Sequence, residues 1–291
     1  MTRLKKTLFW TGLGIYGLLV FLLLTLYRLP ADKLLGTALT LFTGTQTLVS
    51  TETVSFSLPL SYALERITCE AYWPQGVSKD RIDSLIFGPE WSRIFSGSVP
   101  LKSEAIFARG RVESRVGVPF LGRGYLDVKG SGIHLEDLSF VGILLDRRVA
   151  GQCEGELRLT GDLRFPTGLK GRGVLLATDG SLESKIPLAG LRTIPFQSIS
   201  AFLIIQKGVL FLNDGKIAGS ALSGTFSGEV KLNDRMSRSL LNITANLTPG
   251  PSFNENDFAR QFLASLAAEG EPITIHLEGS LGSPSIRLGK D

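Results

Sequence analysis

Polar and apolar residues alternate along most of this chain, but its first part follows two other patterns. Residues 7–27 are uncharged and mostly apolar. A run of this length matches the ~20 helical residues that cross a bilayer core of about 30 Å. Residues 30–43 then place apolar side chains at helical spacing after Pro30, a residue that suits the first turn of a helix. The pattern predicts a transmembrane helix followed by a short, membrane-proximal amphipathic helix.

The apolar run is predicted to be an uncleaved anchor. Basic residues precede it, which places residues 1–6 in the cytoplasm. A cleaved signal peptide is the alternative, but its apolar region is usually only ~7–15 residues long and ends at a small-residue cleavage site, which this sequence lacks. We therefore expect a single-pass protein of a bacterial inner membrane with a periplasmic C-terminal domain. The residues expected in the bilayer include Leu8, Phe9, Trp10, Leu18, Leu19, Phe21, Leu22, Leu23 and Leu24.

From residue 47 onward the period is mostly two, which is typical of half-buried β-strands. Turns rich in Gly and Pro are expected at 74–76, 88–90 and 97–100, and a second amphipathic helix at 254–268. Strands of about 6–8 residues are expected, among others, at 54–58, 105–112, 124–130, 155–163, 171–176, 199–206, 208–217, 224–232 and 273–279.

The predicted fold class is mainly β: an N-terminal transmembrane helix, then a large twisted antiparallel β-sheet domain with one or two short amphipathic helices. This domain covers residues 47–291, and a subdivision near residue 150 is left open. Glycine-spaced strands favour a sheet that grows hairpin by hairpin, and a long open sheet curls as it twists. A curled sheet has a concave face, which forms a groove if the apolar side chains line it. The pattern alone does not distinguish such an open sheet from a packed sandwich.

Composition and candidate chemistry argue against a catalytic site. The net charge is only +4, and the sequence lacks the clustered Lys and Arg residues of a nucleic-acid-binding surface. His134 and His276 have no second ligand at metal spacing, and Ser223 lacks the flanking glycines of a nucleophile elbow and is assigned to a turn. Acidic pairs such as Glu136/Asp137 and Glu154/Glu156 are expected on a solvated face. We predict no enzyme, metal, cofactor, small-molecule substrate or nucleic-acid partner.

Cys69 and Cys153 are the only cysteines. An oxidising compartment permits them to form a disulfide. Their wide separation, without a C-x-x-C motif or an adjacent histidine, argues against a zinc site or a redox pair. Two buried free thiols are slightly favoured, and the disulfide stays open.

Several parts of the chain carry resemblances to two known families. The anchor, the segment from Tyr27 to Leu35 and the glycine-punctuated β domain together resemble type II secretion system protein N. The segment from Gly208 to Leu232 and the closing segment from Leu277 to Ile286 are similar to the AsmA-type β modules of bacterial envelope proteins. The first resemblance implies an inner-membrane component of the protein-export machine, without catalytic residues. The second implies a lipid-facing groove.

Three hypotheses follow. The leading one is a non-enzymatic scaffolding or interaction module of a type II secretion system, with membrane lipids and secretion-apparatus proteins as partners. The alternative is an AsmA-like protein that binds or handles lipid in an apolar β groove. A membrane-tethered hydrolase of cell-wall or polysaccharide substrates is the third, and it needs a cleft with converging carboxylates.

Overall fold

The computed structural model describes the β-rich part of the chain almost completely. The described residues are 16, 17, 21, 35–37, 40, 46–57, 60–73, 76–90, 98–119, 124–145, 147–162, 166–188, 191–233, 238–250, 272–281 and 283–289.

Most of the predicted anchor, with Leu8, Phe9, Trp10, Leu18, Leu19, Leu22, Leu23 and Leu24, lies outside the described residues, as does the helix predicted at 254–268. Within the part that is described, Tyr16, Gly17 and Phe21 are helical, and no helix is long and apolar enough to span a bilayer. The anchor therefore stays a prediction. Of the helix predicted at 30–43, residues 35–37 and 40 are described, and they are helical.

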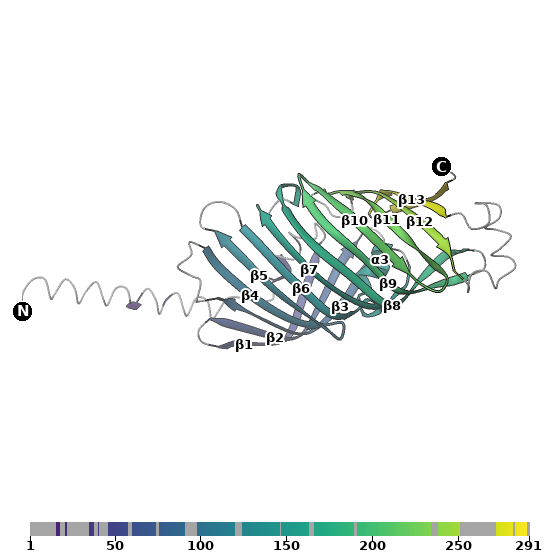
Figure 1. The fold of residues 1–291 in the computed structure, drawn as a ribbon. Coiled ribbons are helices and arrows are strands. Elements are labelled where there is room, and N and C mark those ends of the chain that lie inside the picture. Colours follow the sequence, from purple (N-terminus) through teal and green to yellow (C-terminus); the bar gives the residue numbers. More distant parts are fainter. Residues whose placement is uncertain are drawn as a thin grey trace, which may run out of the picture.

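All strands of the described chain belong to one antiparallel sheet of 14 strands, in which each strand pairs with its neighbours in sequence (Figure 1). This arrangement confirms the predicted class: mainly β, with one large antiparallel sheet. The strands are β1 Thr47–Ser57, β2 Ser61–Trp73, β3 Gly76–Pro89, β4 Ser98–Phe107, β5 Gly110–Pro119, β6 Gly124–His134, β7 Val149–Gly161, β8 Lys170–Leu188, β9 Leu191–Gln206, β10 Val209–Ala218, β11 Leu222–Lys231, β12 Leu240–Pro249, β13 Ile273–Ser280 and β14 Ser283–Gly289. The ladder runs without a break through residue 150, which lies in β7.

Several boundaries differ from the sequence prediction. The strand predicted at 105–112 is a hairpin, because Ala108 and Arg109 have positive φ angles of 50° and 59° and turn the chain between β4 and β5. The turn predicted at 97–100 is strand from Ser98 onward. Ser223 lies in β11 rather than in a turn. Most of the strands are also longer than expected, and β8 reaches 19 residues.

The sheet curls along its length, so its first strands pass behind the middle ones (Figure 1). Register shifts occur in β3, β6, β7 and β10, between Ile82 and Ser84, Gly130 and Ile133, Ala150 and Gln152, and Leu212 and Gly215. Such bulges bend a strand and increase its local twist. We call the face inside the curl the inner face and the opposite one the outer face.

One short helix that the sequence did not predict lies on the inner face. It is α3 (Ser139–Leu145), which follows the 3₁₀ turn η2 (Leu135–Asp137) in the connection from β6 to β7. The amide of Ser139 donates a 2.6 Å hydrogen bond to the carboxylate of Asp80 on β3. A second 3₁₀ turn, η3 (Pro166–Gly168), precedes β8.

Candidate functional site

The inner face carries an apolar row that crosses the sheet at right angles to the strands. Residues that face each other across antiparallel strands share a face of the sheet, so the register defines the row. From β1 to β13 its members are Phe56, Tyr62, Phe87, Ser103, Ser114, Val128, Leu157, Gly173, Leu203, Leu212, Gly228, Ile243 and Leu277. We call this row the inner strip.

Apart from Tyr62 with its phenol hydroxyl, only two side chains of the inner strip carry a polar group, and these two satisfy each other. The hydroxyls of Ser103 and Ser114 are 2.7 Å apart and share a hydrogen bond. A buried hydroxyl without a partner costs free energy, so this pair keeps the strip compatible with an apolar ligand.

The inner strip is half-buried along its whole length. Every strip side chain larger than glycine has intermediate exposure. Leu175, in the next row of the inner face, is 40% exposed. A residue in the core of a two-layer protein is usually covered from the opposite side. The strip therefore lies on a single layer of sheet whose inner face is only partly covered by the described residues.

Three small buried clusters flank the strip instead of one continuous core. The first contains Leu64, Ile67 and Leu85 on β2 and β3; the second contains Leu159, Leu169 and Ile205; the third contains Ala221, Leu222 and Leu247. Leu169 and Leu232 come from connections between strands and pack on the second cluster, so these loops fold over one rim of the inner face.

The inner face at the beginning of the sheet is covered by aromatic rings and contacted by residues 35 and 40. Phe56 and Tyr62 meet edge to face with ring centroids 5.1 Å apart, and Tyr62 stacks on Phe87 at 5.3 Å. Burial raises the pKa of Tyr62. Leu35 packs against the first cluster, and the amide of Thr47 donates to the hydroxyl of Thr40 at 3.1 Å. The segment predicted as an amphipathic helix thus contacts the start of the inner face.

The η2 turn before α3 is held by a cluster of charged side chains. Arg109 donates hydrogen bonds of 2.6 Å to Glu136 and to Asp137. Glu136 also lies 3.1 Å from His134 Nδ1 and accepts the amide of Gly151 at 3.1 Å. Desolvation raises the pKa of Glu136, but hydrogen bonds from its own amide, Gly151, His134 and Arg109 outweigh it and lower the pKa to about 2.

This cluster corrects one expectation and explains a turn. Glu136 and Asp137 are exposed to solvent, as expected, but they lie on η2 rather than on a strand and bind Arg109. Both residues of the β4–β5 turn are held by residues at the end of β6 and on η2. The amide of His134 donates to the carbonyl of Ala108 at 2.9 Å, and the side chain of Arg109 binds Glu136 and Asp137. The sequence holds no signal for these contacts, since Arg109 and Glu136 lie far apart along the chain.

The remaining candidate residues do not assemble into a reactive site. Cys69 and Cys153 are free, half-buried thiols on β2 and β7. Burial raises the pKa of both thiols, that of Cys69 to about 11 with a further contribution from Asp80. His276 contacts Thr244 at 3.1 Å. Glu156 pairs with Arg158 on the outer face, as a solvated carboxylate does.

Across the residues that the structure describes, no group of three or more His, Cys, Asp or Glu side chains could hold a metal ion. The inner strip is therefore the candidate site that the fold offers. No family model, curated protein or solved structure matches this chain.

Proposed function

We propose that this chain binds the acyl chains of lipids along the inner strip. The observation that carries the proposal is the strip itself: a row of half-buried apolar side chains from Phe56 to Leu277 on one layer of curled sheet. Apolar surface that stays partly accessible gains free energy when an apolar ligand covers it.

The dimensions of the strip support a lipid ligand. Thirteen strands at about 4.8 Å per strand give roughly 60 Å along the sheet. One acyl chain spans about half of a ~30 Å bilayer core. The strip is therefore long enough for more than one acyl chain placed end to end. The predicted anchor would keep the start of the sheet close to a supply of lipid.

The charges support binding rather than catalysis. The described carboxylates with an ion-pair partner lie mostly on the outer face or at turns, such as Glu104 and Glu113 with Arg111. The inner strip offers no ionised group to polarise a substrate. The role in a type II secretion system rests on the resemblance alone and stays a second proposal, compatible with a lipid-binding inner face.

Photocrosslinking tests the lipid proposal. The full chain, in membranes loaded with a fatty acid or phospholipid that carries a diazirine in its acyl chain, is irradiated and digested, and the labelled peptides are mapped. We expect labelled peptides that contain Leu157, Leu203 and Leu212, in addition to those of the predicted anchor. Labels confined to residues 1–45 would refute the proposal.

A matched pair of variants sharpens this test. Leu203→Glu places a charge in the inner strip and should abolish strip labelling, because a buried charge excludes an acyl chain. Ile106→Glu makes a similar change on the outer face, where Ile106 is 44% exposed, and should leave strip labelling intact. Circular dichroism checks that both variants keep the sheet.

A further inference from the structure

The outer face changes character at β8. One of its cross-strand rows begins with charged residues on β4 to β8 and continues with apolar residues on β9 and β10. In register, the row reads Lys102, Arg115, Asp127, Arg158, Arg172, Ile204 and Phe211. In the neighbouring row, Val174 on β8 faces Phe202 on β9. Apolar side chains thus gather on three adjacent strands, directly beside the charged part of these rows.

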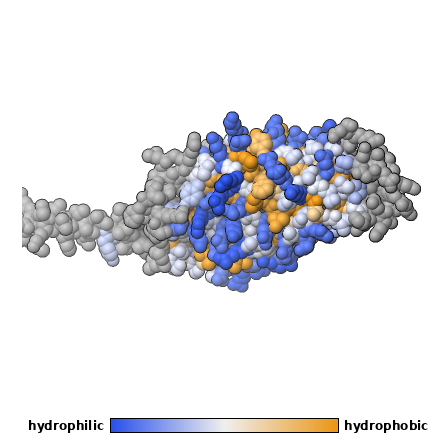
Figure 2. All heavy atoms as spheres, viewed as in Figure 1, coloured by the Kyte–Doolittle hydropathy of each residue, from blue (hydrophilic) through white to orange (hydrophobic). Residues whose placement is uncertain are grey.

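These side chains are well exposed. Phe202 is 55% exposed, Val174 44%, and Leu176 and Ile204 39% each. Together with Phe211 they form what we call the outer patch. Figure 2 shows apolar surface across the middle of the visible face, bordered by hydrophilic side chains. A contiguous apolar patch with a polar rim marks an interaction surface.

Cations line one side of the outer patch. Arg158 and Arg172 face each other directly across β7 and β8, an arrangement that costs free energy because their charges repel. Glu156 pairs with Arg158, whereas Arg172 and Lys170 have no carboxylate within ion-pair distance in the described part of the chain.

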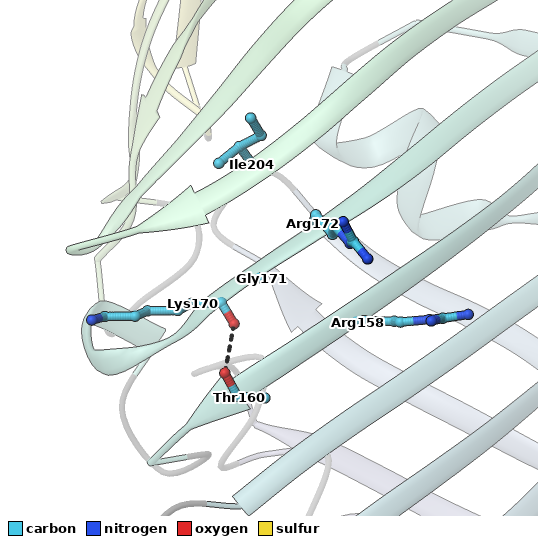
Figure 3. Close-up of a pocket in the computed structure, with 6 residues that line it drawn as sticks. All are labelled: Arg158, Thr160, Lys170, Gly171, Arg172 and Ile204. Carbon is cyan, nitrogen blue, oxygen red and sulfur yellow. Dashed lines mark hydrogen bonds between the residues drawn. The ribbon is translucent and has the colours of Figure 1, made fainter.

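A shallow hollow of about 460 Å³ lies here, lined by Arg158, Thr160, Lys170, Gly171, Arg172 and Ile204 (Figure 3). The two arginine side chains extend in the same direction over the sheet. Uncompensated cations beside exposed apolar side chains fit a ligand surface that is anionic outside and apolar beneath.

We propose that the outer patch rests on the anionic surface of the bilayer that the predicted N-terminal helix crosses. Lipid phosphates accept hydrogen bonds from Arg158, Arg172 and Lys170, while Phe202 and its neighbours enter the boundary between headgroups and acyl chains. A second copy of the chain fits less well, because self-contact would gather the cations of both copies in one interface.

The proposal fixes an orientation. β8 lies seven strands from β1, about 34 Å along the sheet, so contact with this bilayer lays the sheet along the membrane. Lys170 lies at the start of β8. The two connections at this end of the strands then lie close to the lipid: η3, which precedes β8, and the turn at Lys207 between β9 and β10. This inference rests on the outer patch and does not depend on lipid binding at the inner strip.

Lipid-depth fluorescence quenching tests it. The full chain, with Cys69 and Cys153 replaced by serine and with Phe202→Cys labelled by bimane, is reconstituted in phosphatidylglycerol–phosphatidylcholine vesicles that contain doxyl-labelled phosphatidylcholine. Lys129→Cys, on an exposed and polar part of the same face, is the control. A lipid bound at the inner strip lies one sheet thickness from both labels, so it quenches them alike.

We expect the label at residue 202 to be quenched several-fold more than the label at 129. Equal quenching at both positions would overturn the proposal. A blue-shifted emission at 202 without lipid quenching would also overturn it and would identify a protein, either a partner or a second copy, as the occupant. Arg172→Glu should weaken the contact at least roughly fivefold, the contribution of one basic side chain near an anionic surface. An unchanged contact would refute the role of the cations.

Discussion

Asp80 on β3 and Ser139 on α3 are joined by a hydrogen bond, and a second hydrogen bond joins Ser139 to Lys79, the neighbour of Asp80. The carboxylate of Asp80 accepts the Ser139 amide at 2.6 Å, and the Ser139 hydroxyl accepts the Lys79 amide at 2.9 Å. These bonds join residues about sixty positions apart in sequence. Through these bonds, the connection from β6 to β7 crosses the inner face and contacts β3, which lies three strands from β6. α3 is therefore fastened at its first residue to a distant part of the sheet.

Loss of this fastening should release α3. Asp80→Ala removes a charged acceptor from the Ser139 amide, and we expect the free energy of unfolding to fall by about 1–3 kcal/mol. Amide hydrogen exchange in residues 139–145 should become faster than in β3 itself. Asp83→Ala is the control, because Asp83 is exposed and lies 3.7 Å from Arg81, a pair expected to contribute little. Equal effects of both variants would contradict the assignment.

The sequence predicted strands where apolar residues alternate with polar ones or form a short run between glycine-containing turns. β11 spaces its apolar residues Leu222, Phe226 and Val230 on one face, and it was expected; β10 was expected as well, although it opens with four consecutive apolar residues. β2 was missed because its alternation breaks at Arg66, where φ is +52°. That irregularity places Leu64 and Ile67 on the same face, although they are three residues apart. A period of two cannot represent such a strand.

The inner strip lay beyond sequence reasoning for a different reason. Periodicity along one strand shows that Leu157 and Leu159 share a face, but it does not show which residue of the next strand lies opposite. Register across strands depends on turn lengths and bulges, such as the shift between Gly130 and Ile133. The direction of curl, which makes one apolar face the inner one, is a property of the whole sheet.

Gly173 should be essential for close approach of β7 and β8. A Cβ atom at this position would lie 2.5 Å from the carbonyl oxygen of Glu156, which is backbone and cannot move aside cheaply. We expect Gly173→Ala to lower the free energy of unfolding by about 1–3 kcal/mol, as overpacking does. A Cβ atom at Gly168 meets nothing within 4 Å, so Gly168→Ala should be close to neutral. Urea denaturation of both variants checks the difference.

Glu136 should make the fold sensitive to acid. Its pKa is lowered from 4.5 to about 2 in the folded chain. A lowered carboxyl pKa contributes stability that is fully present above about pH 4.5 and is lost as the pH falls toward 2. The carboxylate is 38% exposed, so solvent screens part of the effect.

Glu136→Gln should therefore be less stable at pH 7 and lose less stability between pH 4.5 and 2. Thermal unfolding at a series of pH values measures both quantities. Glu113→Gln, which alters an exposed pair with Arg111, should keep the acid sensitivity of the parent. If the two variants have the same pH profile as the parent, the hydrogen bonds to Glu136 do not contribute to acid sensitivity.

Cys69 should react slowly with alkylating reagents. Burial first, and then the charge of Asp80, raise its pKa from 9.0 to about 11. Near pH 8 this shift leaves roughly a hundredfold less thiolate than an ordinary thiol, and only the thiolate is nucleophilic. We expect slow iodoacetamide labelling of the folded chain, measured by mass spectrometry, and fast labelling in urea. Asp80→Asn should speed the reaction only in part, since desolvation is the larger cause.

Because Cys153 is also a free, half-buried thiol, both cysteines should be labelled after unfolding without a reductant. A chain that required reduction before it could be labelled would show that the two cysteines form a disulfide.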